Sequence, residues 1–222
     1  MIHRIDKYIL KELLTHDSLP FSELRPPGVE SNTLTYRLKR FLNEGIVGKT
    51  EHGYYLTAAG QRFTDNLNLG KFVTRDLPKP LILMMCTQGD EWLLYKRAIH
   101  PLKDLSGFPH ANVKPGISVL ESAQTRLNEV IGLKTRFAYR GSGFLAFYKG
   151  ENLEGYNHFT VVKNVTPITG ILNPEPEEGM GRYYWQKDPD FTSSDYIASL
   201  KDITKLAMEN SGPFFAELTY HL

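Results

Sequence analysis

The sequence predicts two domains, an α+β domain with three or four helices and one β-hairpin, followed by an α/β sandwich with a mixed sheet. The chain has 222 residues, of which 41% are hydrophobic and 23% are charged, as is typical of globular domains. Pro78 and Pro80 separate a helical pattern from a run of strand patterns. We therefore expect a first domain over residues 1–70, a linker over 71–79 and a second domain over 80–222.

The first domain begins with apolar residues at helical spacing, from Ile2 to Leu14. A short helix over 18–24 is expected to start near Pro20, since proline is tolerated in a first turn. A third helix over 32–43, with Ser31 as its N-cap, buries a stripe made by Leu34, Leu38, Phe41 and Leu42. A hairpin over 46–57 and a last helix over 58–67 complete the predicted domain.

This order of elements resembles the winged helix-turn-helix domain of bacterial transcription regulators, over about residues 1–68. The stretch SNTLTYRLKRFLNEGIVGKTEHGYYLTAAGQRF resembles the recognition helix, the wing and the helix after it. The resemblance implies binding to double-stranded DNA through polar and basic groups that reach bases or phosphates. The candidate DNA-binding residues are Asn32, Thr33, Thr35, Tyr36, Arg37, Arg40, Lys49 and His52. The alternative is a solvated helix face in a dimerisation or protein-binding domain.

The second domain alternates strand patterns with turns. Strands over 80–86 and 91–98 are expected to pair across the turn at Gln88-Gly89-Asp90. A helix over 118–131 is predicted to end at Gly132. Further strands are expected at 135–139, 143–148, 156–162 and 181–186, followed by an amphipathic helix over 195–209.

The segment from Gly107 to Leu133 resembles the Nudix box, whose pattern is Gly, five residues, Glu, seven residues, then Arg-Glu-apolar-any-Glu-Glu-any-Gly-apolar. The resemblance covers about residues 78–210 and implies a Nudix-like α/β/α sandwich. Aligned without a gap, Glu129, Gly132 and Leu133 match the pattern. Other positions depart from it: the box Glu residues fall on Ile117, Arg126 and Val130, its Arg on Thr125 and its first Gly on Ala111.

Nudix proteins hydrolyse a nucleoside diphosphate linked to another group and hold a divalent metal ion on helix carboxylates. Because this box keeps Glu129 and places Arg126 where a carboxylate belongs, we expect no catalytic residues, no metal site, no cofactor and no enzymatic activity. The remaining pocket is expected to bind a nucleotide-derived small molecule. Its candidate ligand-binding residues are Arg97, Lys114, Arg126, Glu129 and Arg140.

The sequence therefore predicts a DNA-binding transcription regulator whose C-terminal domain senses a nucleotide-derived metabolite. One alternative is a divergent hydrolase that completes a metal site from the loop holding Glu175, Glu177 and Glu178. Another is a non-catalytic interaction scaffold. A homodimer is expected from the DNA-binding class.

Composition adds weaker limits. The formal net charge of +1 excludes a polybasic coat but not a local basic patch. A single cysteine, Cys86, is compatible with a reducing compartment. The charged N-terminus lacks the apolar core of a signal peptide, and the longest apolar run, Leu81 to Cys86, is too short to cross a bilayer. We therefore expect a cytoplasmic protein with no membrane partner.

Overall fold

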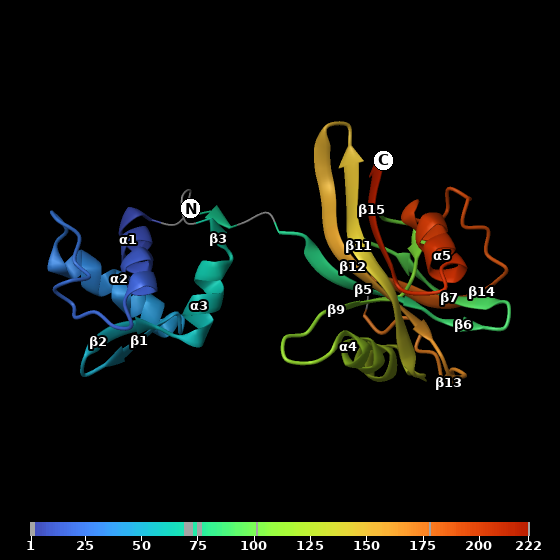
Figure 1. Ribbon diagram of the computed structural model, residues 1–222, viewed down its shortest axis with the longest axis horizontal. Coiled ribbons are helices and arrows are strands. Elements are labelled where there is room, and N and C mark those ends of the chain that lie inside the picture. Colours follow the sequence, from blue (N-terminus) through green and yellow to red (C-terminus); the bar gives the residue numbers. More distant parts are fainter. Residues whose placement is uncertain (1–2, 69–72, 75–76, 101, 178, 222) are drawn as a thin grey trace. The chain divides into compact units, whose positions relative to one another are not determined.

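The computed structural model divides the chain into two compact units, residues 1–76 and 77–222 (Figure 1). The structure describes residues 3–68, 73–74, 77–100, 102–177 and 179–221. Residues 71, 72, 75 and 76 of the predicted linker lie outside the described residues. Other parts of the predicted linker form strands, because β4 lies at Val73–Thr74 and β5 begins at Lys79.

The N-terminal unit contains three helices and two small antiparallel strand pairs. Its elements are α1 (Arg4–Thr15), α2 (Ser31–Asn43), β1 (Val47–Thr50), β2 (Gly53–Leu56), α3 (Ala58–Asp65), β3 (Leu67–Asn68) and β4 (Val73–Thr74). The hairpin of β1 and β2 forms where the sequence predicts it. The predicted stripe of α2 is also found, with Leu34, Leu38 and Phe41 buried and Leu42 packed against the same core.

The predicted helix over 18–24 is wrong. Leu19 instead forms an antiparallel bridge with Tyr54 of β2, and their two backbone hydrogen bonds measure 2.9 and 2.8 Å. The carbonyl of Pro20 then accepts from the amides of Glu23 and Leu24, which makes a single turn. Pro20 is compatible with the first turn of a helix, but Leu19 is extended and pairs with the hairpin.

Asp6 joins α1 to α2 inside the N-terminal unit. Its side chain is buried, and Oδ2 accepts from Arg40 Nη2 at 3.0 Å and from Arg37 Nη1 at 3.4 Å. A buried carboxylate needs such partners, since leaving a charge unpaired in the interior is costly. The two arginines therefore help to hold the helices together.

The C-terminal unit is a mixed α/β structure. Its elements are β5 (Lys79–Met85), β6 (Thr87–Gln88), β7 (Glu91–Arg97), β8 (Ser106–Gly107), β9 (His110–Asn112), α4 (Val119–Thr125), the π-helical turn η1 (Arg126–Ile131), β10 (Leu133–Lys134), β11 (Phe137–Lys149), β12 (Asn152–Asn164), β13 (Thr169–Gly170), β14 (Gly181–Lys187), α5 (Ser199–Glu209) and β15 (Phe214–His221).

Two sheets form the centre of this unit. The larger has the order β15-β11-β12-β5-β9 and is mixed, because β15 runs parallel to β11 and β5 runs parallel to β12. The smaller has the order β14-β7-β6, with β8 also paired to β7. Figure 1 shows α4 and α5 on opposite sides of the sheets. The predicted α/β/α sandwich with a mixed sheet is therefore present.

The predicted pairing of the first two strands is wrong. β5 pairs with β12 and β9 in the larger sheet, whereas β7 pairs with β6, β8 and β14 in the smaller one. The chain passes between the sheets at Cys86, whose carbonyl accepts from the amide of Leu93 at 3.0 Å. Burial raises the pKa of the Cys86 thiol well above its ordinary value.

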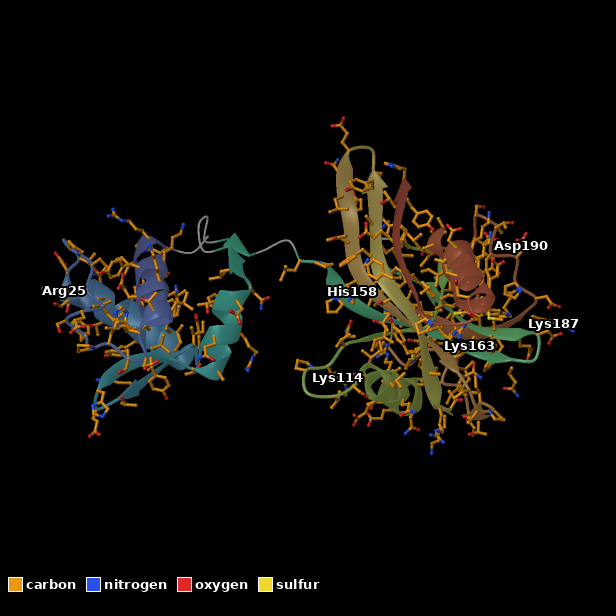
Figure 2. The ribbon with its side chains drawn as sticks, viewed as in Figure 1. Arg25, Lys114, His158, Lys163, Lys187 and Asp190 are labelled. Atoms are coloured by element: carbon orange, nitrogen blue, oxygen red, sulfur yellow. The ribbon has the colours of Figure 1, made fainter. Side chains whose placement is uncertain are left out.

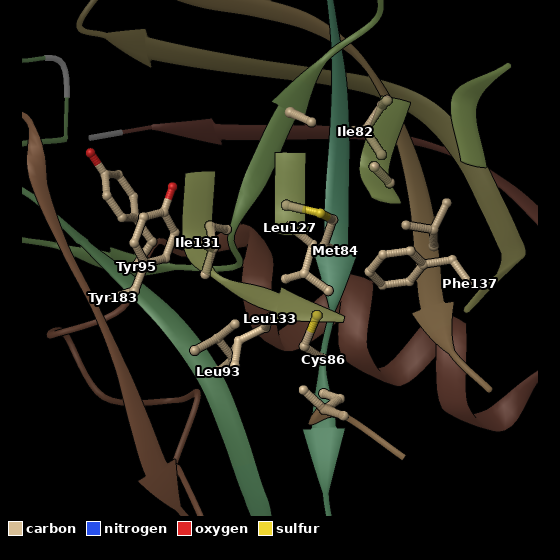
Figure 3. Packing of buried hydrophobic residues seen from close by; sticks show 14 residues of the cluster. Ile82, Met84, Cys86, Leu93, Tyr95, Leu127, Ile131, Leu133, Phe137 and Tyr183 are labelled. Atoms are coloured by element: carbon tan, nitrogen blue, oxygen red, sulfur yellow. The ribbon is translucent and has the colours of Figure 1, made fainter. Parts of the chain in front are cut away.

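The helix with the box-like sequence packs on a buried apolar cluster. Figure 3 shows Leu127 and Ile131 beside Met84 of β5 and Leu93 of β7. Ser118 caps the helix, because its Oγ accepts from the amide of Glu121 at 3.1 Å. Gly132 ends it at φ +82°, a conformation that favours glycine. Packing and both ends thus fix where Arg126 and Glu129 lie.

No helix in the described part of the chain combines the length and the apolar character needed to cross a membrane.

The contact of Asp6 with Arg37 and Arg40 gives the first prediction. Asp6→Asn removes the charge that both guanidiniums contact, and we expect a local stability loss of about 1–3 kcal/mol. Amide hydrogen exchange in α1 of the full chain should therefore accelerate. Asp17→Asn, at an exposed position of the same unit, is the matched control and should leave α1 unchanged. Equal exchange in the wild type and Asp6→Asn would contradict the structural role.

Candidate functional site

Two adjoining recesses open in the C-terminal unit. The first, the cationic recess, has a volume of about 350 Å³ and is lined by Lys79, Arg97, Lys114, Arg126, Glu129 and Glu177 among others. The second, the apolar recess, has a volume of about 380 Å³ and is lined by Leu81, Leu83, Phe108, Leu145, Phe147 and Leu200 among others. Lys79, Tyr95, Arg97 and His110 line both recesses. One ligand can therefore place a charged part in one recess and an apolar part in the other.

Arg126 is held in the cationic recess by hydrogen bonds to two side chains. Its Nη1 donates to Glu177 Oε1 at 2.8 Å and its Nη2 donates to Glu177 Oε2 at 3.1 Å, which makes a two-pronged ion pair. Nη2 also donates to the hydroxyl of buried Tyr183 at 3.3 Å. The bond to Glu177 raises the pKa of the Arg126 guanidinium, and Arg126 lowers the pKa of the Glu177 carboxyl.

Tyr95 and His110, which line both recesses, are part of a cluster of rings that also includes Tyr183. The Tyr95 ring lies 4.7 Å from that of Tyr183 and 5.4 Å from the imidazole of His110, and the Tyr95 hydroxyl donates to the carbonyl of Met180 at 2.7 Å. Burial, followed by the charges of Arg97, Arg126 and Lys79, lowers the pKa of His110 to about 4. His110 is therefore neutral at pH 7 and adds no positive charge.

Ser122 lines the cationic recess from α4. Its side chain is 1% exposed, and its Oγ finds no hydrogen-bond partner among the described residues. A buried hydroxyl without a partner is uncommon in folded proteins. The Oγ atom itself is buried, so Ser122 contributes to the wall of the recess on the side of α4.

The residues of this recess do not fit the divalent-metal site of Nudix proteins. Within the described chain, no group of three or more His, Cys, Asp and Glu side chains is placed to hold a metal ion. Three residues before Glu129, at a position where the box has a carboxylate, the helix carries Arg126, and that guanidinium lines the same recess. Its fixed positive charge opposes a second cation nearby.

The structure brings four of the five predicted ligand residues to one place. Arg97 from β7, Arg126 and Glu129 from η1, and Lys114 from the loop before α4 all line the cationic recess (Figure 2 labels Lys114). Arg140 lies elsewhere, because its Nε and Nη2 donate to the carbonyl of Ala207 and Nη2 also donates to that of Asn210. It closes the end of α5 instead of lining either recess.

Several residues of the site were not among the predicted ones. Lys79 lines both recesses because β5 pairs with β9. The sequence did not predict this pairing. His110 lines both recesses, and Phe108 and Phe147 line the apolar one. The acidic residues of the loop before β14 lie in different places. Glu177 lines the cationic recess, whereas Glu175 does not. Glu178 lies outside the described residues.

The predicted DNA-binding residues of the N-terminal unit fall into two groups. Asn32, Tyr36, Lys49 and His52 are exposed, and Thr33 and Thr35 are half-buried on α2. Arg37 and Arg40 instead direct their guanidiniums to Asp6. The first group lies on α2 and at or near the tip of the β1–β2 hairpin.

The low pKa of His110 gives the second prediction. The unfolded chain binds a proton at the ordinary histidine value near 6.5, whereas folded His110 binds one near pH 4. The free energy of unfolding should therefore fall as the pH falls from about 6.5 to about 4. His110→Gln should flatten this dependence in urea unfolding, followed by Trp92 and Trp185 fluorescence, which reports on the C-terminal unit alone. Identical slopes in the wild type and the variant would contradict it.

Comparison with known proteins identifies the fold of the C-terminal unit. No protein-family model and no curated protein matches the sequence. A crystal structure of the mutator MutT protein from Bacillus halodurans is 16% identical, with a TM-score of 0.53 over 64% of this chain and 90% of that chain. A MutT NUDIX hydrolase from Burkholderia pseudomallei is 13% identical, with a TM-score of 0.49 over 60% of this chain and 100% of that chain. A bifunctional NMN adenylyltransferase/ADP ribose pyrophosphatase from Francisella tularensis is 14% identical, with a TM-score of 0.45 over 82% of this chain and 52% of that chain.

These similarities correct one prediction. The expectation that the chain is not an enzyme is wrong as stated, because it took the lost box carboxylates as decisive, whereas the C-terminal unit shares its fold with a MutT protein. The winged-helix assignment of the N-terminal unit and its binding to DNA stay predictions. The C-terminal unit has a Nudix-like fold.

Proposed function

We propose that the C-terminal unit binds and hydrolyses a nucleoside diphosphate linked to another group. The observation that supports this most is the junction of the cationic and apolar recesses at Lys79, Tyr95, Arg97 and His110. A nucleotide conjugate has matching parts, a charged diphosphate beside flat or less polar groups. The Nudix-like fold favours the same substrate class.

The charges of the cationic recess suit a diphosphate. Lys79, Arg97, Lys114 and Arg126 contribute four cations, and Glu129 and Glu177 contribute two carboxylates. Arginine binds phosphate oxygens through two parallel donors, and lysine acts as a point charge.

The apolar recess suits the remaining part of the substrate. Phe108 and Phe147 contribute aromatic surface, and Asn157 and Glu154 of β12 bring polar groups to the lining. Pockets for small ligands commonly combine apolar walls with a few polar groups that set orientation. A base or sugar is the part that we place here.

Hydrolysis requires a water molecule to attack one phosphorus while the bond from that phosphorus to the bridging oxygen breaks. The water oxygen joins the attacked phosphorus, a proton is released, and two phosphate monoesters leave. In our proposal Glu129 accepts the proton of the attacking water. Arg126 and Arg97 balance the negative charge that develops on the phosphate oxygens. No step of this scheme passes through a metal ion.

The role of Glu129 gives the third prediction. Glu129→Gln should lower kcat on nucleoside diphosphate sugars by about a hundredfold, since it removes the proton acceptor. Glu121→Gln, on the same helix but outside the cationic recess, is the matched control and should keep wild-type kcat. Chromatography of the released nucleoside monophosphate, with magnesium and with a chelator, measures the rate. Absence of turnover by the wild type in both conditions would overturn the proposal.

A second proposal concerns the N-terminal unit, which we infer to be a winged helix that binds double-stranded DNA. It is supported by the exposed polar face of α2 next to the exposed hairpin, which offers Asn32, Tyr36, Lys39 and Lys49. The bridge between Leu19 and Tyr54 adds a third extended segment to the hairpin. Regulation of transcription by the ligand of the C-terminal unit, and a homodimer, belong to this proposal.

The fourth prediction follows from the exposed lysines. Lys39→Ala and Lys49→Ala should each weaken binding to DNA and lower the salt slope by about one, because each removes one phosphate contact. Lys11→Ala, exposed on α1, is the control for net charge and should change neither quantity. Fluorescence anisotropy on DNA from upstream of the protein's own gene, against a scrambled duplex, measures both. Equal weak binding of the wild type to both duplexes would count against sequence-specific recognition.

A further inference from the structure

The guanidinium of Arg126 is already engaged by an anion from its own chain. Two nitrogens of Arg126 donate to the two oxygens of Glu177, at 2.8 and 3.1 Å. A phosphate presents two oxygens to arginine in the same two-pronged way. The Glu177 carboxylate therefore lies where a phosphate of a ligand would bind Arg126.

The two partners of this ion pair are not equally fixed. The Arg126 side chain is 23% exposed, lies on η1 and is also held by the hydroxyl of Tyr183. The Glu177 side chain is 46% exposed and comes from the loop between β13 and β14. Release of the half-exposed Glu177 carboxylate restores its hydration, whereas Arg126 keeps its hydrogen bond to Tyr183.

The surroundings favour a phosphate over this carboxylate. A diphosphate carries more negative charge than Glu177, and Lys79, Arg97 and Lys114 line the same recess. Exchanging Glu177 for such a ligand therefore places more negative charge among these cations.

We propose that Glu177 is an internal competitor for the phosphate site at Arg126, so that ligand binding requires its carboxylate to leave the guanidinium. The inference rests on the proposed function, because it concerns how the same recess takes its ligand. Ligand affinity is then reduced by the fraction of molecules in which Glu177 occupies Arg126. In the absence of ligand, the same contact keeps a partly buried cation paired.

The competition is tested with inorganic pyrophosphate, titrated into the full chain by calorimetry at constant ionic strength. Glu177→Gln keeps the size of the side chain and removes its charge, and it should bind pyrophosphate about tenfold more tightly than the wild type, equivalent to 1.4 kcal/mol. Glu175→Gln removes the same charge from the same loop, at a position outside the cationic recess. It should bind within about twofold of the wild type, because exposed charges are screened over distance.

The same test in a variant of Arg126 distinguishes direct competition from a general effect of charge. Arg126→Lys keeps the positive charge but cannot make two parallel donations. Adding Glu177→Gln to Arg126→Lys should therefore give a much smaller gain in affinity than it gives in the wild type. Thermal unfolding of each variant, followed by tryptophan fluorescence, shows whether the C-terminal unit has kept its fold.

The outcomes distinguish the two proposals. Pyrophosphate binding that depends on Arg126 but is unchanged by Glu177→Gln would overturn the competition and leave the proposed substrate class standing. Equal gains in Glu177→Gln and Glu175→Gln would also overturn it, since the effect would be one of net charge. Tighter binding in Glu177→Gln alone, without hydrolysis of any nucleoside diphosphate sugar, would support the competition and count against the proposed activity. No binding to the wild type or to Glu177→Gln would overturn both.

Discussion

The positive charge of Arg126 on the helix is the constraint on which the site of the C-terminal unit depends. It lies where the Nudix box has a carboxylate, and the structure surrounds it with groups that suit a cation, namely Glu177, the hydroxyl of Tyr183 and the nearby Glu129. Lys79 and Arg97 then extend the positive charge toward the apolar recess. The Nudix box that this helix resembles holds a metal ion through acids, whereas the site that we propose here binds an anion directly.

This arrangement depends on the fold around it. Capping by Ser118 and termination at Gly132 set the length of the helix, and Leu127 and Ile131 fix its rotation against the sheets. Arg126 and Glu129, three residues apart, consequently face the recess together. The same sequence segment that has lost most box acids has kept the residues that place the helix.

Local sequence patterns predicted the positions of helices and strands better than they predicted which strands pair with each other. The hairpin of β1 and β2, the stripe of α2 and the end of the helix at Gly132 follow from spacing and turn residues that lie close together in the chain. The pairing of β5 with β12 and β9 depends on residues far apart, and β15 was not predicted at all. Alternation of apolar residues indicates a strand, but it does not say which sheet the strand joins.

The site was predicted unevenly for the same reason. Arg97, Lys114, Arg126 and Glu129 were found because the box alignment points to their neighbourhood. Arg37 and Arg40 were predicted to bind DNA because the sequence does not show that they contact Asp6. That contact joins two helices that lie far apart in the chain. The contact of Glu177 with Arg126 spans 51 positions in the chain and carries no local signal. Lost carboxylates, finally, were too narrow a ground for excluding catalysis.

Cys86 gives the C-terminal unit a built-in reporter. Its side chain is buried where the chain passes from one sheet to the other, and burial raises the pKa of its thiol. Because a thiol is labelled when its exposed thiolate attacks the reagent, labelling of Cys86 requires this unit to open. The chain contains no second cysteine, so the rate of modification measures the opening of one unit without an engineered probe. A ligand that binds the folded unit lowers the population of the open form, and the labelling rate then falls by a factor that grows exponentially with the stability the ligand adds.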